Sequence, residues 1–311
     1  MLALRLICPT HLTAALTEVL QLQPGATHLV QLPGAALEPP GDVLLADLAR
    51  EAVTDVVTAL RDRAGDRCAI TLETVDTTVS RYADAAEEAA PGRGVDAVVW
   101  EEVEARSGEE SELSGAFLAL LVIATLLAAI GVMLDSPVLV VGAMVVGPEF
   151  GPVAGLTVAL AERRLPLAMR SLRALLVGFP VAIAASAALT LALRLTVELP
   201  AAYVGEQRPL TAFVSKPDGY ALLVALLAGV AGVVSLTSAK SSALVGVAVS
   251  VTTVPAAADI GVAAAAGRWG ECAGAAAQLL VNLLALVAAG GATLAVRRRA
   301  AGRRRVRTGR D

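Results

Sequence analysis

Residues 136–164 read SPVLVVGAMVVGPEFGPVAGLTVALAERR, and this stretch decides the fold. It is apolar and long enough to cross a bilayer, which takes about 20 helical residues. Its centre, residues 147–152, reads GPEFGP, and each proline removes a backbone N–H and clashes with the preceding helical turn. We therefore predict a broken membrane helix, which lipid tolerates only where the break faces protein or a water-filled cavity.

A second stretch further along the chain repeats this pattern. Residues 241–267 read SSALVGVAVSVTTVPAAADIGVAAAAG, with a serine start, a run of small residues, a central proline at Pro255 and an acid at Asp259. The pattern predicts a second broken helix.

The composition is that of a membrane protein. Hydrophobic residues make up 56% of the 311 residues, mean hydropathy is +0.69, and aromatic residues contribute 3%. Alanine, valine, leucine and glycine carry the apolar fraction, as in closely packed membrane helices. Residues 1–113 hold 20 acids and 8 bases, whereas the remainder holds 9 acids and 17 bases. We therefore predict an acidic soluble domain followed by a membrane domain with a basic tail.

The first part of the chain, residues 1–78, is predicted to be a cytosolic α+β domain of the ferredoxin-like kind. Residues 42–48 fit either a strand or the start of a helix, and Pro33-Gly34 is expected to end the strand before them. With residues 42–48 as a strand, the order is β-α-β-β-α-β, which is ferredoxin-like. By analogy with other small sandwiches, a small-molecule ligand of this domain is expected. The remaining predicted elements are strands at 2–8, 27–32 and 67–75, and helices at 10–20 and 49–63.

Residues 79–113 are predicted to form an acidic helical connector. A short helix over residues 80–90 is closed by Pro91-Gly92, and residues 95–112 then mix many acids with a few apolar residues. Such an acid run is typical of a solvated helix face. The alternative is that this acidic surface docks the basic tail.

Residues 114–296 are predicted to form the transmembrane domain. The second and fifth of its apolar segments carry the breaks, and each is the middle member of a group of three. Because three is odd, two tandem groups have opposite orientations, as in inverted-repeat transporters whose discontinuous helices meet at the bilayer midplane. The six segments are residues 114–134, 137–162, 171–193, 219–237, 242–266 and 272–296.

The placement of lysine and arginine predicts that both termini are cytosolic. With the N-terminus inside, 13 bases fall on the inner side of the membrane domain and its tail, and 4 on the outer side. Tyr203, Tyr220 and Trp269 are then expected at the outer interface. The basic cytosolic tail, residues 297–311, is expected to contact anionic lipids. Nucleic-acid binding is not expected, because no aromatic residues are interleaved with the arginines.

Three segments carry a family resemblance: residues 141–160 (VGAMVVGPEFGPVAGLTVAL), residues 237–269 (TSAKSSALVGVAVSVTTVPAAADIGVAAAAGRW) and residues 278–283 (QLLVNL). Together they resemble the bacterial membrane proteins catalogued as domain of unknown function 389, in their actinobacterial type. The family often has a hydrophobic residue in place of Glu149 and a second proline in place of Ala256. The resemblance implies a multi-pass protein of the bacterial cytoplasmic membrane, and it implies no particular activity.

The two acids within the broken segments are candidate binding residues. Glu149 lies about 18 Å along the helical rise of its segment, near the bilayer centre. A charge there costs at least about 2.5–3.5 kcal/mol, so Glu149 is expected to be protonated, paired or hydrated. Two roles are open for Glu149. It is either a functional group that couples to protons or binds a cation, or a structural group that stays neutral or caps a helix. Asp259 lies about 12 Å from the outer end of its segment, where solvent is expected to reach it.

The other candidate binding residues are prolines, threonines and one asparagine. Prolines that break a helix free backbone carbonyls. Threonine hydroxyls contact either a ligand or a carbonyl of their own helix. A buried asparagine either joins two helices or contacts a ligand. These residues are Pro148, Pro152, Pro255, Thr252, Thr253 and Asn282.

Enzymatic chemistry is not predicted. Cys8, Cys68 and Cys272 have no paired spacing, and the histidines are His11 and His28, so no disulfide framework, metal or cofactor is expected. No phosphate-binding loop or nucleophile–base pattern is found.

We hypothesise a secondary transporter or permease of a small solute, coupled to protons or cations and regulated by the soluble domain. The alternatives are a membrane-anchored sensor or scaffold without transport, or an ion channel; a homo-oligomer in the lipid bilayer is expected.

Overall fold

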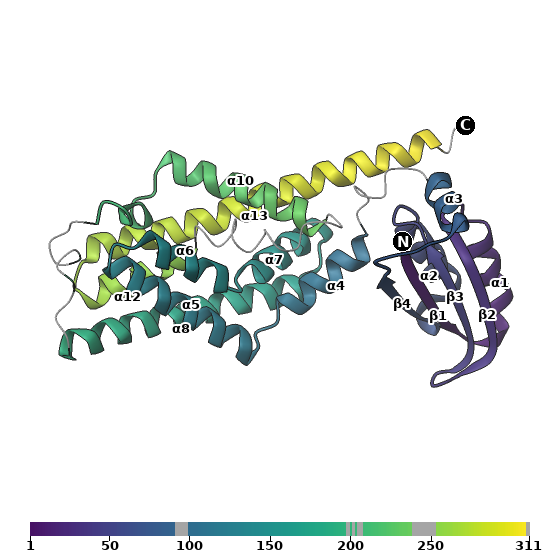
Figure 1. The fold of residues 1–311 in the computed structure, drawn as a ribbon, viewed down its shortest axis with the longest axis horizontal. Coiled ribbons are helices and arrows are strands. Elements are labelled where there is room, and N and C mark those ends of the chain that lie inside the picture. The colour runs from purple at the N-terminus through teal and green to yellow at the C-terminus, as the bar shows by residue number, and fades with distance from the viewer. Residues whose placement is uncertain (91–98, 197–199, 201–202, 204–207, 238–252, 309–311) are drawn as a thin grey trace. The chain divides into compact units, whose positions relative to one another are not determined.

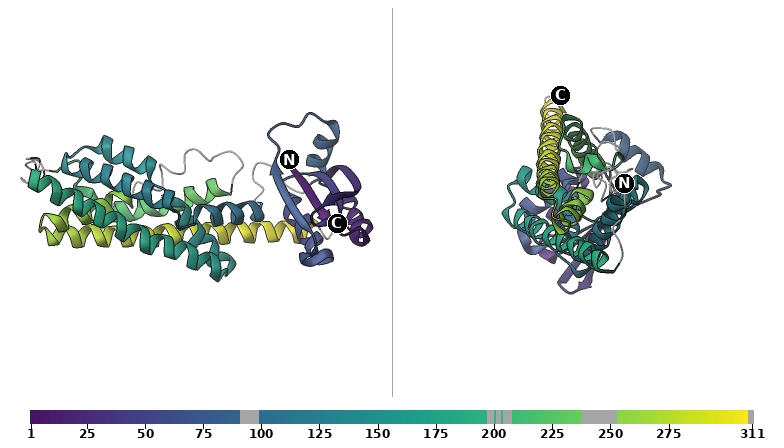
Figure 2. Two further views of the ribbon diagram at one scale, coloured as in Figure 1. Left: turned by 90° about the horizontal axis from the view of Figure 1, so that it is seen from below. Right: turned by 90° about the vertical axis from the view of Figure 1, so that its left-hand side faces the viewer.

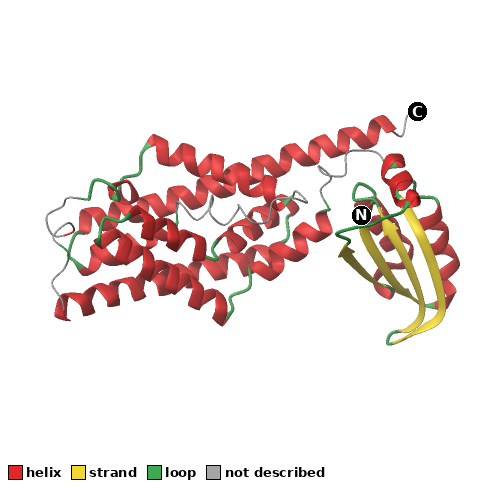
Figure 3. Cartoon of the chain, in the orientation of Figure 1, coloured by secondary structure: helices red, strands yellow, loops and turns green. Residues whose placement is uncertain are grey.

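The computed structural model describes residues 1–90, 99–196, 200, 203, 208–237 and 253–308, without the side chains of residues 101–102, 104–106 and 300–308. The chain divides into two compact units, Met1–Val103 with Thr237–Ala239, and Glu104–Leu236 with Lys240–Asp311. The described strands all belong to the first unit, and the second unit is helical (Figure 3).

The first unit contains a four-stranded antiparallel sheet with two helices packed on one face (Figure 1). The predicted element order β-α-β-β-α-β is confirmed, and the strands lie in the order β2-β3-β1-β4. The elements are β1 (Leu2–Cys8), α1 (Thr10–Gln21), β2 (Ala26–Leu37), β3 (Pro40–Leu48), α2 (Val53–Ala64) and β4 (Ala69–Thr74).

The core of this unit follows from the two periodicities in its sequence. Along β1, every second side chain from Leu2 to Cys8 is buried, because successive side chains of a strand point to opposite faces. The buried face packs against Leu16 and Leu20 of α1 and against the apolar face of α2. Residues 42–48, which fitted two alternatives, form all but the first two residues of β3.

The second strand is longer than the sequence predicts. The expectation that Pro33-Gly34 ends it is wrong, because β2 continues to Leu37 and pairs with β3 across a turn at Glu38-Pro39. A shift in register between Leu32 and Ala36 accommodates the two residues. The N–H of Gly34 donates to the carboxylate of Asp42 (2.8 Å).

Short elements follow the sheet domain. A 3-10 turn, η1 (Gly65–Arg67), leads into β4, and the short helix predicted over residues 80–90 is confirmed as α3 (Arg81–Ala89). Part of the predicted connector is helical as α4 (Trp100–Glu110), while residues 91–98 lie outside the described residues.

The second unit contains several helices that could cross a membrane. Four are long and apolar enough singly, α5 (Gly115–Met133), α8 (Leu165–Thr196), α10 (Gly219–Leu236) and the Trp269–Arg299 part of α13 (Trp269–Thr308). A fifth is possible if α6 (Pro137–Val146) and α7 (Phe150–Glu162) form one span bent by 57°. These described helices agree with the predicted multi-pass membrane protein. Of the predicted fifth segment, residues 242–252 lie outside the described residues, and the rest contributes α12 (Val254–Ala265).

The helices of this unit pack closely through small residues. Helix α12 packs against α5, α8 and α13, and α10 lies along α13 (Figure 2). At the crossing of α12 with α8, a methyl group on Gly261 would lie 2.5 Å from the carbonyl oxygen of Ile183, and the Ser186 hydroxyl donates to the Ala258 carbonyl (2.8 Å). Small residues at such crossings allow the backbones to approach and to hydrogen-bond between helices.

A similar crossing joins the end of α4 to α7. Gly151 and Gly155 are four residues apart and face Ser111, whose hydroxyl lies 3.2 Å from the Gly151 carbonyl oxygen and donates to it. A methyl group on Gly155 would overlap this hydroxyl. The half of the broken pair that follows the break is therefore held directly against the segment that precedes α5.

The Asp42 carboxylate gives the first unit a pH-dependent stability. It is buried and accepts hydrogen bonds from Gly34, Thr13 (2.7 Å) and Thr10 (3.1 Å). The Gly34 N–H and then the Thr13 hydroxyl hold the pKa of Asp42 below its ordinary value. These bonds therefore stabilise the unit fully above the unfolded pKa of about 3.9, and their contribution is lost as pH falls through the lower folded pKa.

We predict that Asp42→Asn lowers the urea concentration at which β2 and β3 lose protection from hydrogen exchange in the full-length protein at pH 7. The difference from wild type should shrink as pH falls from about 3.9 toward the lower folded pKa, below which the native carboxylate also becomes neutral. Asp76→Asn, at an exposed position, serves as the control. A difference that stays constant down to pH 2.5 would contradict this account.

Candidate functional site

The predicted break in the second apolar segment is confirmed. Helix α6 ends at Val146, Gly147 leaves the helical conformation with ψ of 127°, and α7 begins at Phe150. Pro152 lies in the first turn of α7, where its missing N–H costs little, and Pro148 lies inside the break.

Glu149 sits at this break and is completely buried. It occupies the N-cap position of α7, but its side chain makes no capping hydrogen bond. Instead, Glu149 Oε1 accepts a hydrogen bond from the hydroxyl of Thr253 (2.8 Å), 104 residues later in the chain. Glu149 Oε2 has no partner among the described residues. The carboxyl group therefore links the two elements that the sequence singled out.

Thr253 is the residue from which α12 starts, and Pro255 lies in the first turn of that helix. The threonine hydroxyl bonds to the Glu149 carboxyl of the other broken segment, which is neither a ligand nor a carbonyl of its own helix, the two alternatives that the sequence left open. Thr252 lies outside the described residues. A methyl group on Gly147 would overlap Glu149 Oε2 and lie 2.9 Å from Val254 Cγ2, so only glycine fits where the two segments meet.

Asp259, the second candidate acid, lies elsewhere. It is about 9 Å further along α12 than Thr253, given the helical rise. The expectation that solvent reaches it is wrong, because its side chain is fully buried and pairs with Arg208 (2.9 Å). Arg208 comes from the polar loop between α8 and α10, and no periodicity in the sequence indicates this pairing. Asp259 Oδ2 has no partner in the described part of the chain.

The Asp259–Arg208 pair belongs to a wider network at this end of the helices. Arg208 also pairs with Glu271 (2.6 Å), which pairs with Arg268 (2.6 Å). The Tyr203 ring lies 4.9 Å from the guanidinium carbons of both arginines. The Tyr203 side chain is buried within this network, and burial, followed by the nearby Asp259 charge, raises its pKa to about 12.

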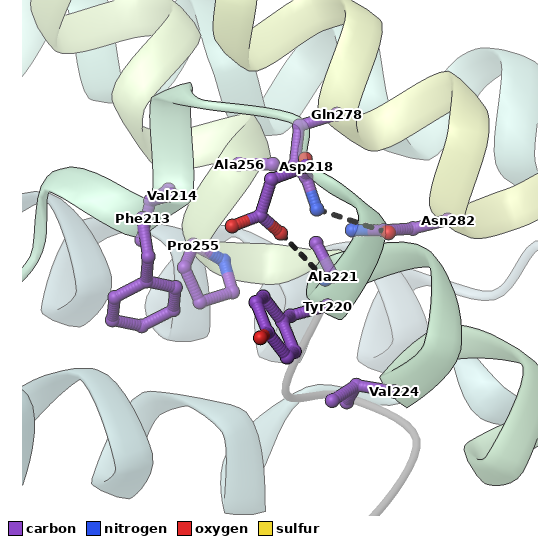
Figure 4. A pocket seen from close by; sticks show the side chains of 10 residues that line it. All are labelled: Phe213, Val214, Asp218, Tyr220, Ala221, Val224, Pro255, Ala256, Gln278 and Asn282. Carbon is purple, nitrogen blue, oxygen red and sulfur yellow. Dashed lines mark hydrogen bonds between the residues drawn. The ribbon is translucent and has the colours of Figure 1, made fainter.

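A cavity of about 210 Å³ opens beside the start of α12 (Figure 4). Pro255 and Ala256 form one part of its wall, and Asn282, a predicted candidate, forms another. Within α13, the Gln278 amide N–H donates to Asn282 Oδ1 (3.1 Å), which leaves Gln278 Oε1 without a partner among the described residues. The remaining lining residues are Phe213, Val214, Asp218, Tyr220, Ala221 and Val224.

Gln278 begins a segment that carries the family resemblance, but the sequence analysis did not name it as a candidate binding residue. Its four-residue spacing from Asn282 places both amides on one face of a helix, and this spacing could have identified it. Asp218 was also missed, since it lies in a polar loop that folds back against α12 and α13 only in the tertiary structure.

The first unit holds an arrangement that the sequence analysis did not find. His28 lies 2.7 Å from Asp47 through Nδ1 and 2.8 Å from the Ser80 hydroxyl through Nε2, which is the atom order of a nucleophile, a base and an acid. The sequence does not indicate this arrangement, because the three residues lie far apart in the chain. The Ser80 hydroxyl accepts the Tyr82 N–H as the cap of α3, so these bonds hold α3 on the sheet. Among the described residues, no group of three or more histidines, cysteines or acids is placed to hold a metal.

Comparison with known proteins gives a family but no activity. Residues 144–288, which include the break and the start of α12, match a family described as a domain of unknown function, DUF389. An uncharacterised protein of Methanocaldococcus jannaschii is 25% identical over 189 residues, which is 61% of this chain and 56% of that protein. The chain thus spans little more than half the length of this curated relative. No solved structure matches.

The contact between the broken segments should be measurable as stability. We predict that Thr253→Val, which keeps the shape of the side chain and removes its donor, destabilises the membrane unit by about 1–3 kcal/mol, the cost of leaving a buried acceptor unsatisfied. Thr253→Ser, which keeps the hydroxyl, should cost clearly less. Thermal unfolding in detergent gives the comparison. If Thr253→Val destabilises a Glu149→Leu variant by as much as it destabilises the wild-type protein, loss of the bond to Glu149 is not the cause of the destabilisation.

The Asp259–Arg208 pair should be more costly to break. We predict that Arg208→Leu destabilises the unit by about 3 kcal/mol or more, because it leaves a buried carboxylate without its counter-ion. The double variant Arg208→Leu/Asp259→Leu should recover much of that loss. Equal thermal stability of the single and double variants would show that the ion pair contributes little.

Proposed function

The chain belongs to the DUF389 family, and from this premise we propose that its membrane unit is a secondary transporter or permease for a small solute. The observation that supports the proposal most directly is the hydrogen bond between Glu149 and Thr253. It brings a buried acid, a broken helix and the start of a second helix to one place beside a cavity. Acids inside a membrane are costly and usually mark ion or substrate pathways.

We further propose that the unit consists of two inverted groups of three spans, with residues 137–162 and 242–266 as the broken middle members. The contacts between connecting segments support alternating crossings. At one end of the helices, the Thr211 N–H donates to Asp135 (2.9 Å), which joins the loop before α10 to the connection between α5 and α6. Arg268 donates to the Tyr203 carbonyl (3.0 Å), which joins the same loop to the connection between α12 and α13. All three connections are predicted to lie on the same side of the membrane. Arg298 pairs with Glu162 (2.8 Å), which joins two segments predicted on the opposite side.

The orientation is proposed from the arginine placement, with both termini in the cytosol. Helix α13 continues without interruption from its apolar part to Thr308 and so carries most of the arginines of residues 297–311 as an extension of the last span. We propose that these arginines contact anionic lipids. A homo-oligomeric state in the bacterial cytoplasmic membrane also remains a proposal.

The first unit is proposed to regulate transport by binding a small molecule. Its element order and its strand order, β2-β3-β1-β4, support a ferredoxin-like sandwich. The argument from fold to ligand is one of analogy. No enzymatic role is proposed for either unit.

Glu149 is the residue that we propose to couple transport to protons or cations. A carboxyl in an apolar interior is costly as an ion, so gaining or losing a proton or cation changes how favourably it is buried. The single hydrogen bond from Thr253 leaves one oxygen open to such a partner among the described residues. Asp259 is instead matched by Arg208, which suits a contact that holds the outer loop against α12.

The test is uptake by the full-length protein in liposomes with an imposed pH gradient. Labelled ethanolamine, glutamate and inositol represent cationic, anionic and neutral solutes, and protein-free liposomes give the leak. For the solute that is taken up, Glu149→Gln should lower gradient-driven uptake at least tenfold, because it keeps an acceptor for Thr253 but cannot ionise. Glu18→Gln, at an exposed position in the first unit, is the matched control.

Two results would count against the proposal. If both Glu149→Gln and Asp259→Asn take up the solute at the wild-type rate, the two acids do not couple transport to protons or cations. If the protein conducts ions across a lipid bilayer, if this conductance does not saturate with ion concentration, and if no solute accumulates along the pH gradient, the protein is a channel instead.

A further inference from the structure

Two of the polar side chains that line the cavity beside α12, Gln278 and Asp218, offer hydrogen-bond acceptors. Gln278 is 4% exposed, and its Oε1 acceptor has no partner in the described part of the chain. Asp218 lines the exposed side of the same cavity, and its carboxylate accepts one hydrogen bond, from the Ala221 N–H (2.7 Å). A carboxylate can accept several hydrogen bonds, so Asp218 retains acceptor capacity. A bound molecule would therefore meet acceptors in need of donors.

The charge among the described residues that line the cavity has one sign; Lys216, two residues before Asp218, is exposed and does not line it. The ten described residues that line it include the acid Asp218 and no lysine, arginine or histidine. Arg208 and Arg268, on the loops at this end of the helices, are both paired with carboxylates. Pro255, which lines the cavity, follows two residues after Thr253, whose hydroxyl bonds to the acid Glu149. An anionic ligand would meet like charge here, whereas a cation would be attracted.

The remaining walls are apolar and aromatic. Phe213 and Tyr220 flank Pro255 in Figure 4. The other apolar lining residues are Val214, Ala221, Val224 and Ala256. The faces of aromatic rings carry partial negative charge and attract organic cations. Such walls also favour a hydrocarbon group over a hydrated metal ion, whose oxygen ligands they do not supply.

We propose that this cavity binds a small organic ammonium ion, a protonated primary amine with a short hydrocarbon or aromatic group. Gln278 Oε1 accepts from the ammonium N–H, Asp218 supplies the opposite charge, and Phe213 and Tyr220 contact the hydrocarbon part. The inference rests on the proposed function in one respect, namely that this molecule is also the transported solute. Binding itself requires only the cavity.

The size of the cavity limits the ligand. A cavity of about 150 Å³ is sufficient for benzene in a protein core, and this one measures about 210 Å³. A benzene ring with one aminomethyl group is therefore a suitable probe. Benzylammonium, benzoate and benzyl alcohol share nearly the same skeleton and differ in charge and in hydrogen-bond donors.

The experiment measures binding of these three compounds to the full-length protein in phosphatidylcholine nanodiscs by calorimetry, with empty nanodiscs as the blank. Benzylammonium should bind at least tenfold more tightly than benzyl alcohol, and benzoate should not bind detectably. Asp218→Asn should weaken benzylammonium at least tenfold while leaving benzyl alcohol unchanged. This variant keeps the oxygen that accepts from Ala221, so the start of α10 remains capped.

Gln278→Leu tests the second group and should also weaken benzylammonium at least tenfold. Asp66→Asn, an exposed acid in the first unit, is the matched control and should bind as wild type does. Equal affinity for benzylammonium and benzoate, or wild-type affinity in Asp218→Asn, would overturn the inference. Binding that is indifferent to charge but lost in Gln278→Leu would identify a site for neutral molecules instead.

The outcomes separate this inference from the proposed function. Selective benzylammonium binding without uptake of any amine into liposomes would leave the site in place and contradict transport. Uptake of glutamate or inositol by a protein that does not bind benzylammonium would support transport and overturn the ammonium site.

Discussion

The hydrogen bond from Thr253 to Glu149 is the interaction on which the membrane unit depends. A carboxyl group buried among apolar helices is unfavourable unless it has a partner, and the sequence offers Glu149 none nearby. Its partner comes from a helix that begins 104 residues later. The bond thus fixes where α12 starts relative to the break between α6 and α7, and glycine at position 147 leaves the room for it.

Close packing of small residues makes this arrangement possible. Gly261 allows α12 to approach α8, and Gly151 and Gly155 allow α7 to approach the end of α4. With almost no hydrophobic driving force between helices in lipid, such contacts and interhelical hydrogen bonds hold a membrane protein together. The two halves of the broken segment are consequently attached to different neighbours. A break whose two sides are held separately is suited to a hinge, because each side can follow its own neighbour.

The two buried acids have different surroundings, which support different proposed roles. Asp259 is matched by Arg208, within a network that includes Tyr203, Arg268 and Glu271. Glu149 has a hydroxyl as its partner and no described counter-charge. An acid with a counter-ion holds structural elements together, whereas an acid without one responds to a proton or a cation. This contrast is why the proposed coupling function rests on Glu149, while the cavity lined by Gln278 and Asp218 lies beside the start of α12.

The sequence alone determined the features that depend on local chemistry. Apolar length predicted the membrane helices, proline and glycine predicted the break at residues 147–149, and alternating leucines predicted β1 of the antiparallel sheet. It could not determine partners, because Arg208, Gln278 and Asp218 reach their positions through contacts between segments far apart in the chain. For the same reason, Pro33-Gly34 suggested a strand end that pairing with β3 overrides, and Asp259 suggested a solvated acid that a loop arginine covers. Only the tertiary structure decided which buried polar groups meet, since burial makes a partner necessary but does not specify which residue supplies it.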